Sequence, residues 1–375
     1  MRVRGAWAAL LCASPFLAAA AFGAQWIAVP QISVGADTDT NRRLRTEPAT
    51  SESGVLAASA YLARATATDT LALVPRVTVS RYSGEDALDS DDWAANALWR
   101  HEGERLHFDL DAGLADDSTL TTEVGETGFI EGNTRRRAGS VAATLTQYLE
   151  TRHMLQYAIS ATDIEYQRAR DTGLVGYRYP AASLLYVFSN TARFSTTFGA
   201  SATRLDAPDA HVRSDTRGAQ LGVRFLAAER CALEARVGST ATSARGRVDH
   251  NRTVYAGLTW NDELSRIELS ASREVEASGR GVLVNADDVR LRFSRELTER
   301  LSLDTSLRAS RRQDIDLRGG LEYRYGTAAA TLSWKLEEAW TLALAGVFSR
   351  QEYASRDPAE GSRIGLALSW RPAQP

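Results

Sequence analysis

Residues 93–114, WAANALWRHEGERLHFDLDAGL, contain two alternating segments joined by a short polar turn. Every second position is apolar in both segments, and the positions between them in the second segment carry His107, Asp109 and Asp111. Successive side chains of a strand point to opposite faces, so this pattern predicts a β-hairpin with one apolar and one charged face. The apolar face comprises Trp93, Ala95, Ala97 and Trp99, followed by Leu106, Phe108, Leu110, Ala112 and Leu114.

The same pattern recurs to the end of the chain, and the apolar face of each unit ends on an aromatic side chain. These aromatics are Trp99, Phe188, Phe225, Trp260, Phe293, Trp334 and Trp370. An apolar band about 25 Å tall that ends in an aromatic girdle and is backed by a polar face is typical of a transmembrane β-barrel. We therefore predict an all-β fold, an antiparallel up-and-down transmembrane barrel, with these residues in its periplasmic girdle. A soluble β-sandwich is the alternative fold.

The alternation predicts eighteen strands, an even number as in bacterial single-chain barrels. Their ranges are 26–36, 55–65, 71–82, the two halves of 93–114, 139–148, 154–163, 176–188, 193–205, 217–226, 231–242, 252–260, 265–275, 287–295, 301–311, 317–334, 340–352 and 363–370. Pro75 predicts a bulge in the third strand. A change of phase near Gly326 predicts a bulge or extra hairpin there, which leaves 16 to 18 strands. The short turns 261–264, 298–300 and 337–339 are expected to be periplasmic, and 115–137 is the longest loop.

The N-terminus has the features of a secretory signal peptide, with Arg2 and Arg4 before an apolar run and then small residues. We expect residues 1–24 to be removed and 25–375 to form one barrel domain in the outer membrane of a Gram-negative bacterium. An uncleaved anchor is the alternative, but the run is shorter than the roughly 20 residues of a spanning helix. The expected partners are outer-membrane lipids, lipopolysaccharide and the barrel-assembly machinery.

The composition of the 375 residues restricts the function further. The net charge is −3 and no basic block occurs, so no nucleic-acid partner is expected. Beyond the signal peptide only Cys231 remains, which excludes an intrachain disulfide. No His/Cys spacing typical of a metal site occurs, and we expect no metal and no cofactor.

Several segments carry a resemblance to a known family. Residues 81–128, RYSGEDALDSDDWAANALWRHEGERLHFDLDAGLADDSTLTTEVGETG, resemble a β-barrel porin family associated with exopolysaccharide and PEP-CTERM gene clusters. Residues 30–41, PQISVGADTDTN, and the final LALSWRP are similar to its first and last strands. The resemblance implies an outer-membrane channel for exopolysaccharide export, with polysaccharide and periplasmic export proteins as partners. The alternatives are a general diffusion porin and a structural or adhesive barrel with a closed lumen.

The inward positions of the predicted strands carry arginines and carboxylates. Those expected to line the lumen are Arg76, Arg105, Asp109, Asp111, Arg224, Arg236, Arg266, Glu268, Arg290, Arg292, Arg308 and Arg324. Guanidinium groups bind carboxylates through two parallel hydrogen bonds, so an acidic glycan is a chemically sensible passenger. Alternatively, these charges simply neutralise one another within the wall.

The sequence offers little for catalysis, and we do not expect an enzyme. His107 with Asp109 is the best acid–base pair, although such neighbours are also ordinary lining. Loop acids such as Asp116 and Asp117 are expected to be solvated turn residues, with Ca²⁺ binding as the alternative. We expect most of a further set of tyrosines to face outward in the girdle, namely Tyr177, Tyr179, Tyr323 and Tyr325.

Overall fold

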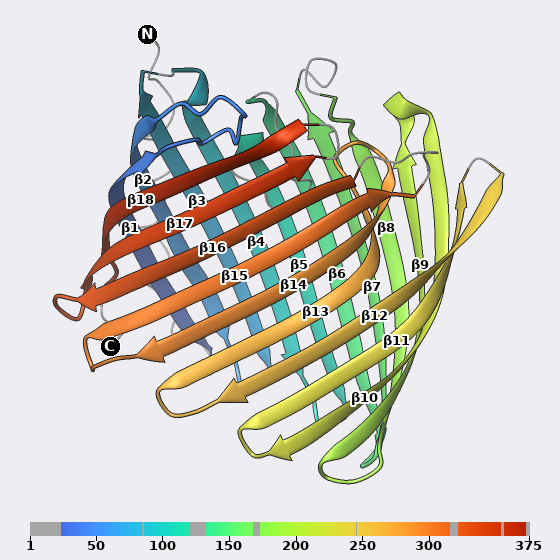
Figure 1. Ribbon diagram of the computed structural model, residues 1–375. Coiled ribbons are helices and arrows are strands. Elements are labelled where there is room, and N and C mark those ends of the chain that lie inside the picture. The colour runs from blue at the N-terminus through green and yellow to red at the C-terminus, as the bar shows by residue number, and fades with distance from the viewer. Residues whose placement is uncertain are drawn as a thin grey trace.

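The protein forms one closed barrel of eighteen antiparallel strands (Figure 1). The structure, a computed structural model, describes residues 24–84, 86–120, 133–167, 173–244, 246–315, 322–353 and 356–372. The predicted signal peptide lies outside these ranges except for Ala24. Within them, no helix is long and apolar enough to cross a membrane. The predicted fold class and strand count are confirmed, and a single closed sheet excludes the two-sheet sandwich.

The strands follow one another around the wall in sequence order, and β18 pairs with β1 to close it. They are β1 (Gln25–Asp39), β2 (Ser51–Ala65), β3 (Asp69–Ser83), β4 (Ser90–Glu102), β5 (Leu106–Ser118), β6 (Arg135–Glu150), β7 (His153–Tyr166), β8 (Tyr177–Ser189), β9 (Phe194–Ala207), β10 (Val212–Ala228), β11 (Cys231–Ala244), β12 (Arg247–Asn261), β13 (Ser265–Ala277), β14 (Leu283–Glu296), β15 (Leu301–Asp314), β16 (Glu322–Lys335), β17 (Trp340–Tyr353) and β18 (Arg356–Trp370). Two short 3₁₀ helices, η2 (Asp86–Leu88) and η3 (Pro208–Ala210), lie in connections.

The continuous register gives the wall an apolar outer face. Val237 lies opposite Val254, for example, and their side chains are 57% and 45% exposed. Ile159 and Ile364 are also more than half exposed on this face. Contiguous apolar surface of this extent is unfavourable in water and favourable in lipid. The outer face therefore contacts the hydrocarbon of a membrane.

The two ends of the barrel differ. The lower end in Figure 1 carries the C-terminal end of β18 and a series of short turns, including 262–264, 297–300 and 336–339. These match the turns predicted to be periplasmic, and they do share one end. The longer connection 40–50 lies at the upper end. The predicted loop 115–137 is partly strand, because β5 reaches Ser118 and β6 begins at Arg135; residues 121–132 lie outside the described ranges.

Neither predicted bulge occurs. The β2–β3 register is the same on both sides of Pro75, with Ser59 opposite Arg76 and Leu62 opposite Leu73. Proline has no backbone N–H, so the ladder lacks one hydrogen-bond donor at this position, but no extra residue is inserted into the strand. The β15–β16 register likewise runs unbroken past Gly326. Residues before Gly326 consequently keep the parity of those after it, which reverses the expected orientation of several side chains.

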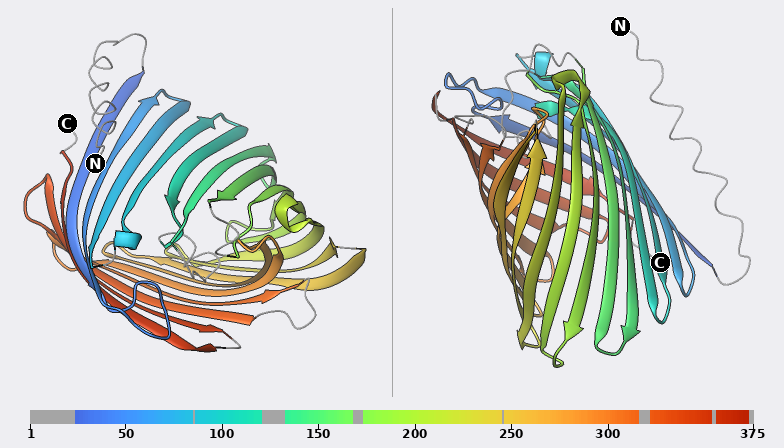
Figure 2. Two further views of the ribbon diagram at one scale, coloured as in Figure 1. Left: turned by 90° about the horizontal axis from the view of Figure 1, so that it is seen from above. Right: turned by 90° about the vertical axis from the view of Figure 1, so that its right-hand side faces the viewer.

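The wall is least regular between β12 and β13. Their ladder joins only Val254–Asn261 to Arg266–Arg273, so the upper parts of the two strands separate. The upper part of β13 and β14 curls into the lumen, whereas the β11–β12 hairpin stands outside it (Figure 2). The lumen is therefore narrowed from one side at its upper end.

We predict that outward and inward substitutions in one strand differ sharply in cost. Leu344 faces lipid and is half exposed, whereas Ala345 faces the lumen. Leu344→Arg is expected to lower the free energy of unfolding by about 2–4 kcal/mol, because a lipid-facing guanidinium loses its water. Ala345→Arg is expected to cost far less. Denaturant unfolding of the barrel refolded into vesicles measures both, and equal losses would contradict the assigned orientation.

Candidate functional site: the barrel lumen

The inward face of the wall carries paired charges. The guanidinium of Arg100 on β4 donates to the carboxylate of Asp109 on β5 over 2.8 Å. On β11, Arg236 lies 3.1 Å from Glu234 and stacks over the ring of Tyr255 at 4.2 Å from its centroid. Opposite charges on neighbouring inward positions hold a hydrated wall together, each pair by about 0.2–1 kcal/mol. Neutralisation within the wall, one of the two sequence interpretations, thus applies to these residues.

Asp288 on β14 is the most buried of the paired acids, with a side chain only 3% exposed. It accepts hydrogen bonds from Arg308 at 3.1 Å and Arg312 at 2.8 Å, and Arg290 lies 3.7 Å away. Arg312 also reaches Glu276 at 3.4 Å. A buried carboxylate is stable only when it is paired and hydrogen-bonded. Asp288 therefore holds the side chains of three arginines together in one part of the wall.

The inner face of β13–β15 carries arginines interspersed with carboxylates. Arg290 lies directly opposite Arg308, and Arg292 lies opposite Glu268, which also pairs with Arg266. Five of the arginines and three of the carboxylates are linked by ion pairs, and this group is called the basic stripe below. Its members are Arg266, Arg290, Arg292, Arg308, Arg312, Glu268, Glu276 and Asp288. Glu274, Asp304 and Asp314 have the same inward parity but do not belong to the group. The exposed guanidinium groups of the basic stripe offer hydrogen-bond donors to an anion.

Ten of the predicted lining residues have inward-facing parity, namely Arg76, Asp109, Asp111, Arg224, Arg236, Arg266, Glu268, Arg290, Arg292 and Arg308. No ion pair joins Arg76, Asp111 or Arg224 to another residue in the described part of the chain. The other two predictions are wrong. Arg105 lies in the turn between β4 and β5, below the wall. Arg324 faces outward, because no bulge occurs at Gly326.

An apolar cluster narrows the upper end of the lumen on the β7–β10 side. It contains Ile164, Tyr177, Leu205, Ala207, Val212 and Leu283. The backbone N–H of Val175 donates to the carbonyl of Gly279 over 2.7 Å, which joins two connections whose strands are not neighbours in the sheet. Gly281 has a φ of +70°, and a side chain there would approach Val175 and Ala207 to about 3.1 Å. Glycine thus allows the two connections to pack together.

The connection between β1 and β2 covers another part of the mouth. The Asn41 side chain donates to the carbonyl oxygens of Glu360 at 2.9 Å and Arg45 at 2.7 Å, which fixes this segment on β18. A pocket of about 450 Å³ lies between the segment and the inner faces of β16–β18. Its polar lining includes Asp39, Arg42, Arg363, Tyr325 and Ser349. The sequence pattern did not indicate Arg42, because a residue outside a strand has no parity from which to predict its position. Arg363 begins the predicted last strand, but its place beneath this segment depends on the fold of the connection.

The four tyrosines expected to lie mostly in the girdle have inward parity instead. Tyr177 and Tyr323 are 8% and 5% exposed, and Tyr179 packs against the apolar cluster. Tyr323 contacts Tyr353 with ring centroids 5.2 Å apart, and Tyr325 lines the pocket beneath the β1–β2 connection. For Tyr323 and Tyr325 the prediction failed because no change of phase occurs at Gly326. Tyr177 and Tyr179 have the parity opposite to the outward Phe188 on the same strand, so they face inward.

The seven aromatics assigned to the periplasmic girdle lie at the lower ends of their strands with outward parity, as the opposition of Trp334 to Leu301 and of Trp370 to Ile32 illustrates. Further aromatics join them at this level. Trp340 lies opposite Trp370, and Phe108 packs edge-on against Trp99 at 5.1 Å. Sequence analysis overlooked these two because it followed only the strands that descend to the lower end.

The histidine–acid pair favoured by sequence is not brought together. Asp109 pairs with Arg100, while the ring of His107 packs against Tyr148 at 5.2 Å. At the lower end, His101 lies 2.9 Å from Asp69 and His153 contacts the hydroxyl of Tyr186. Within the described ranges, no group of three or more His, Cys, Asp or Glu residues is arranged to hold a metal ion.

Comparison with known proteins relates the chain to solved outer-membrane structures. No family model and no curated protein sequence matches it. OccK2 (OpdF) of Pseudomonas aeruginosa superposes with a TM-score of 0.50 and 12% identity over 92% of this chain and 98% of that one. The outer membrane protein OpdK of the same organism gives 0.46 and 12% over 92% and 99%, and OccAB4 of Acinetobacter baumannii gives 0.48 and 8% over 92% and 99%. At these identities the likeness concerns the fold.

A closed sheet with a lipid-facing outer wall, a charged inner wall and an aromatic lower rim belongs in the outer membrane of a Gram-negative bacterium. The predicted location is therefore confirmed. The lumen remains the candidate functional site.

Removing the buried acid of the basic stripe is predicted to destabilise the barrel. Asp288→Asn leaves Arg308 and Arg312 without their common counter-charge and is expected to cost about 3–5 kcal/mol. The matched control, Asp109→Asn, breaks a pair that is largely exposed and is expected to cost no more than about 1 kcal/mol. Denaturant unfolding in vesicles distinguishes the two, and similar small losses would show that Asp288 is not essential to the wall.

Proposed function

We propose that this protein is an outer-membrane diffusion channel for small polar solutes. The observation that carries the proposal is the charged inner face of a closed wall of eighteen strands. Barrels of 16–18 strands enclose an aqueous channel unless connections fill it. Outer-membrane lipids, lipopolysaccharide and the barrel-assembly machinery would be its partners.

The narrowed mouth favours small solutes over a polymer. The apolar cluster and the segment held by Asn41 each occupy part of the opening, so a polysaccharide chain would have to displace them. Exopolysaccharide export, which the family resemblance implied, is therefore the second candidate. A barrel with a closed lumen is the third, and a conductance measurement separates it from both.

The exposed arginines of the wall support a preference for anions. The basic stripe contains five arginines and three carboxylates, and Arg42 and Arg363 line the pocket at the mouth together with Asp39. The guanidinium groups of Arg290 and Arg292 are largely exposed, so they remain available to a solute. Small carboxylates are the chemical class that such groups bind best, because a guanidinium can donate two parallel hydrogen bonds to a carboxylate.

Charge reversal in the basic stripe tests this preference. The double variant Arg290→Glu and Arg292→Glu changes the stripe from five arginines and three carboxylates to three and five. We expect the refolded channel in a planar bilayer to change from anion to cation preference, measured as the reversal potential in a salt gradient. Arg324→Glu is the matched control, because Arg324 faces outward, and its selectivity is expected to equal that of the wild type. Unchanged selectivity of the double variant, or a complete lack of conductance in the wild type, would contradict the proposal.

The segment on β18 is predicted to limit solute size. Replacing residues 41–46 by a short Gly-Ser linker removes the Asn41 anchor and Leu44, so the pocket opens into the lumen. Single-channel conductance and the largest solute admitted in liposome swelling are both expected to increase. Replacing the lower turn 262–264 in the same way should change neither. Equal behaviour of the two variants would show that the mouth is not the narrowest part of the channel.

A further inference from the structure

The outer wall carries charged side chains above its apolar band. Several of them form one-to-one pairs between neighbouring strands, in which a single arginine meets a single acid at 2.5–3.0 Å. These pairs are Arg178–Asp163, Arg204–Asp215 and Arg273–Asp287. Their level, above the hydrocarbon and toward the upper end, is that of the lipid headgroups of the outer leaflet. Side chains here meet phosphates and sugars rather than acyl chains.

The wall over β15–β17 departs from this one-to-one pattern. Arg311 and Arg324 lie directly opposite each other in the register, and both bind the one carboxylate of Glu322, each at 2.8 Å. Like charges facing each other across a ladder are unfavourable unless an anion lies between them. Each guanidinium group has five N–H donors, and the carboxylate of Glu322 accepts hydrogen bonds from only a few of those on Arg311 and Arg324. Most of the donors therefore remain available to a second anion.

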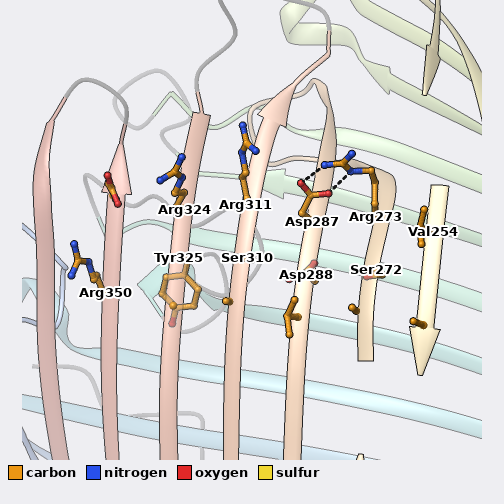
Figure 3. Close-up of a pocket in the computed structure, with 16 residues that line it drawn as sticks. Val254, Ser272, Arg273, Asp287, Asp288, Ser310, Arg311, Arg324, Tyr325 and Arg350 are labelled. Atoms are coloured by element: carbon orange, nitrogen blue, oxygen red, sulfur yellow. Dashed lines mark hydrogen bonds and ion pairs between the residues drawn. The ribbon is translucent and has the colours of Figure 1, made fainter. Parts of the chain in front are cut away.

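Below these arginines the outer wall is hollowed. The hollow has a volume of about 710 Å³, and Arg311, Arg324 and Arg350 lie along its rim (Figure 3). Arg350 is on the strand next to Arg324 and pairs with Glu360 at 3.2 Å, and Glu352 on the same strand lies opposite Arg324 and also lines the hollow. In the same view Arg273 is held by Asp287, so its guanidinium is already occupied.

The floor of the hollow is apolar and made of side chains smaller than those beneath it. Ala271, Val289, Ala309 and Gly326 lie opposite one another in a single row across β13–β16. The next row toward the membrane centre contains Leu269, Leu291 and Leu307. The surface thus offers an apolar recess continuous with the lipid-facing band, directly below three arginines whose guanidinium groups are only partly occupied by neighbouring carboxylates. An amphiphile with an anionic headgroup matches both parts.

We propose that Arg311, Arg324 and Arg350 bind a phosphate group of a lipopolysaccharide molecule in the outer leaflet, whose acyl chains lie on the floor of the hollow. The guanidinium groups select a phosphorylated lipid, because their paired N–H donors match phosphate oxygens. The upper-end position selects the outer leaflet. Binding at this site is independent of whether the lumen conducts.

Binding is tested with the full barrel refolded in detergent micelles, by native mass spectrometry and by titration. The probes are lipopolysaccharide with intact lipid A phosphates, the same lipid after dephosphorylation, and inorganic phosphate. We expect the intact lipid to bind roughly tenfold more tightly than the dephosphorylated lipid, and the double variant Arg311→Gln and Arg324→Gln to lose that advantage. Arg204→Gln, an outward arginine of a one-to-one pair, serves as the control and is expected to bind as the wild type does.

The variant Glu322→Gln is expected to have the opposite effect on lipid binding from the arginine variants. It removes the carboxylate that competes for both guanidinium groups, so the intact lipid is expected to bind more tightly, whereas a purely structural role of the cluster predicts no gain. Gel mobility without boiling verifies folding of every variant, and Arg350→Gln replaces the double variant if that one does not fold. The proposal is overturned if the intact and dephosphorylated lipids bind the wild type equally, if Arg204→Gln weakens binding as much as the cluster variant, or if inorganic phosphate binds as tightly as the lipid.

Discussion

Every backbone N–H and C=O group that lies in hydrocarbon must find a partner within the protein, and this constraint determines the rest of the structure. A sheet meets it only by closing on itself, since an open edge would leave a row of unpaired groups. The pairing of β18 with β1, from Ile32 opposite Trp370 to Asp39 opposite Arg363, completes the wall. When every pair of neighbouring strands in a closed sheet is antiparallel, including the first and the last, the number of strands must be even. Eighteen strands meet this requirement.

Closure separates the side chains into two populations with different solvents. Outward residues meet lipid over the middle of each strand and headgroups toward the upper end, where arginine–acid pairs replace leucine and valine. Inward residues meet water over much of the wall, so charges are tolerated there, whereas some inward residues near the upper end are buried. The same cross-strand ion pair therefore has two uses in this molecule. Inside, as in Arg100–Asp109, it holds a hydrated wall; outside, as in Arg204–Asp215, it marks the level of the headgroups.

The strands, of 13–17 residues, exceed the roughly 9–11 that a tilted strand needs to cross the bilayer. The excess lies at the upper end, where the side chains have a protein environment instead of lipid. Tyr177, Leu205 and Tyr323 are buried there against connections that lean over the lumen. The narrowing of the mouth and the inward orientation of the tyrosines thus have one cause, which is packing among segments far apart in the chain.

The sequence by itself determined the fold class, the number of strands, the parity of most of them and which end carries the short turns, because a two-residue period is a local property that any continuous strand displays. It also placed most of the inward charges, including Arg290 and Arg308. Only the tertiary structure decided the orientation of Arg324 and the position of Arg42 and Arg363 beneath the β1–β2 connection. The same holds for the hydrogen bond between Val175 and Gly279 and for the hollow on the outer wall. These depend on the register between strands and on contacts between connections, and a pattern within one strand contains no information about what lies opposite it.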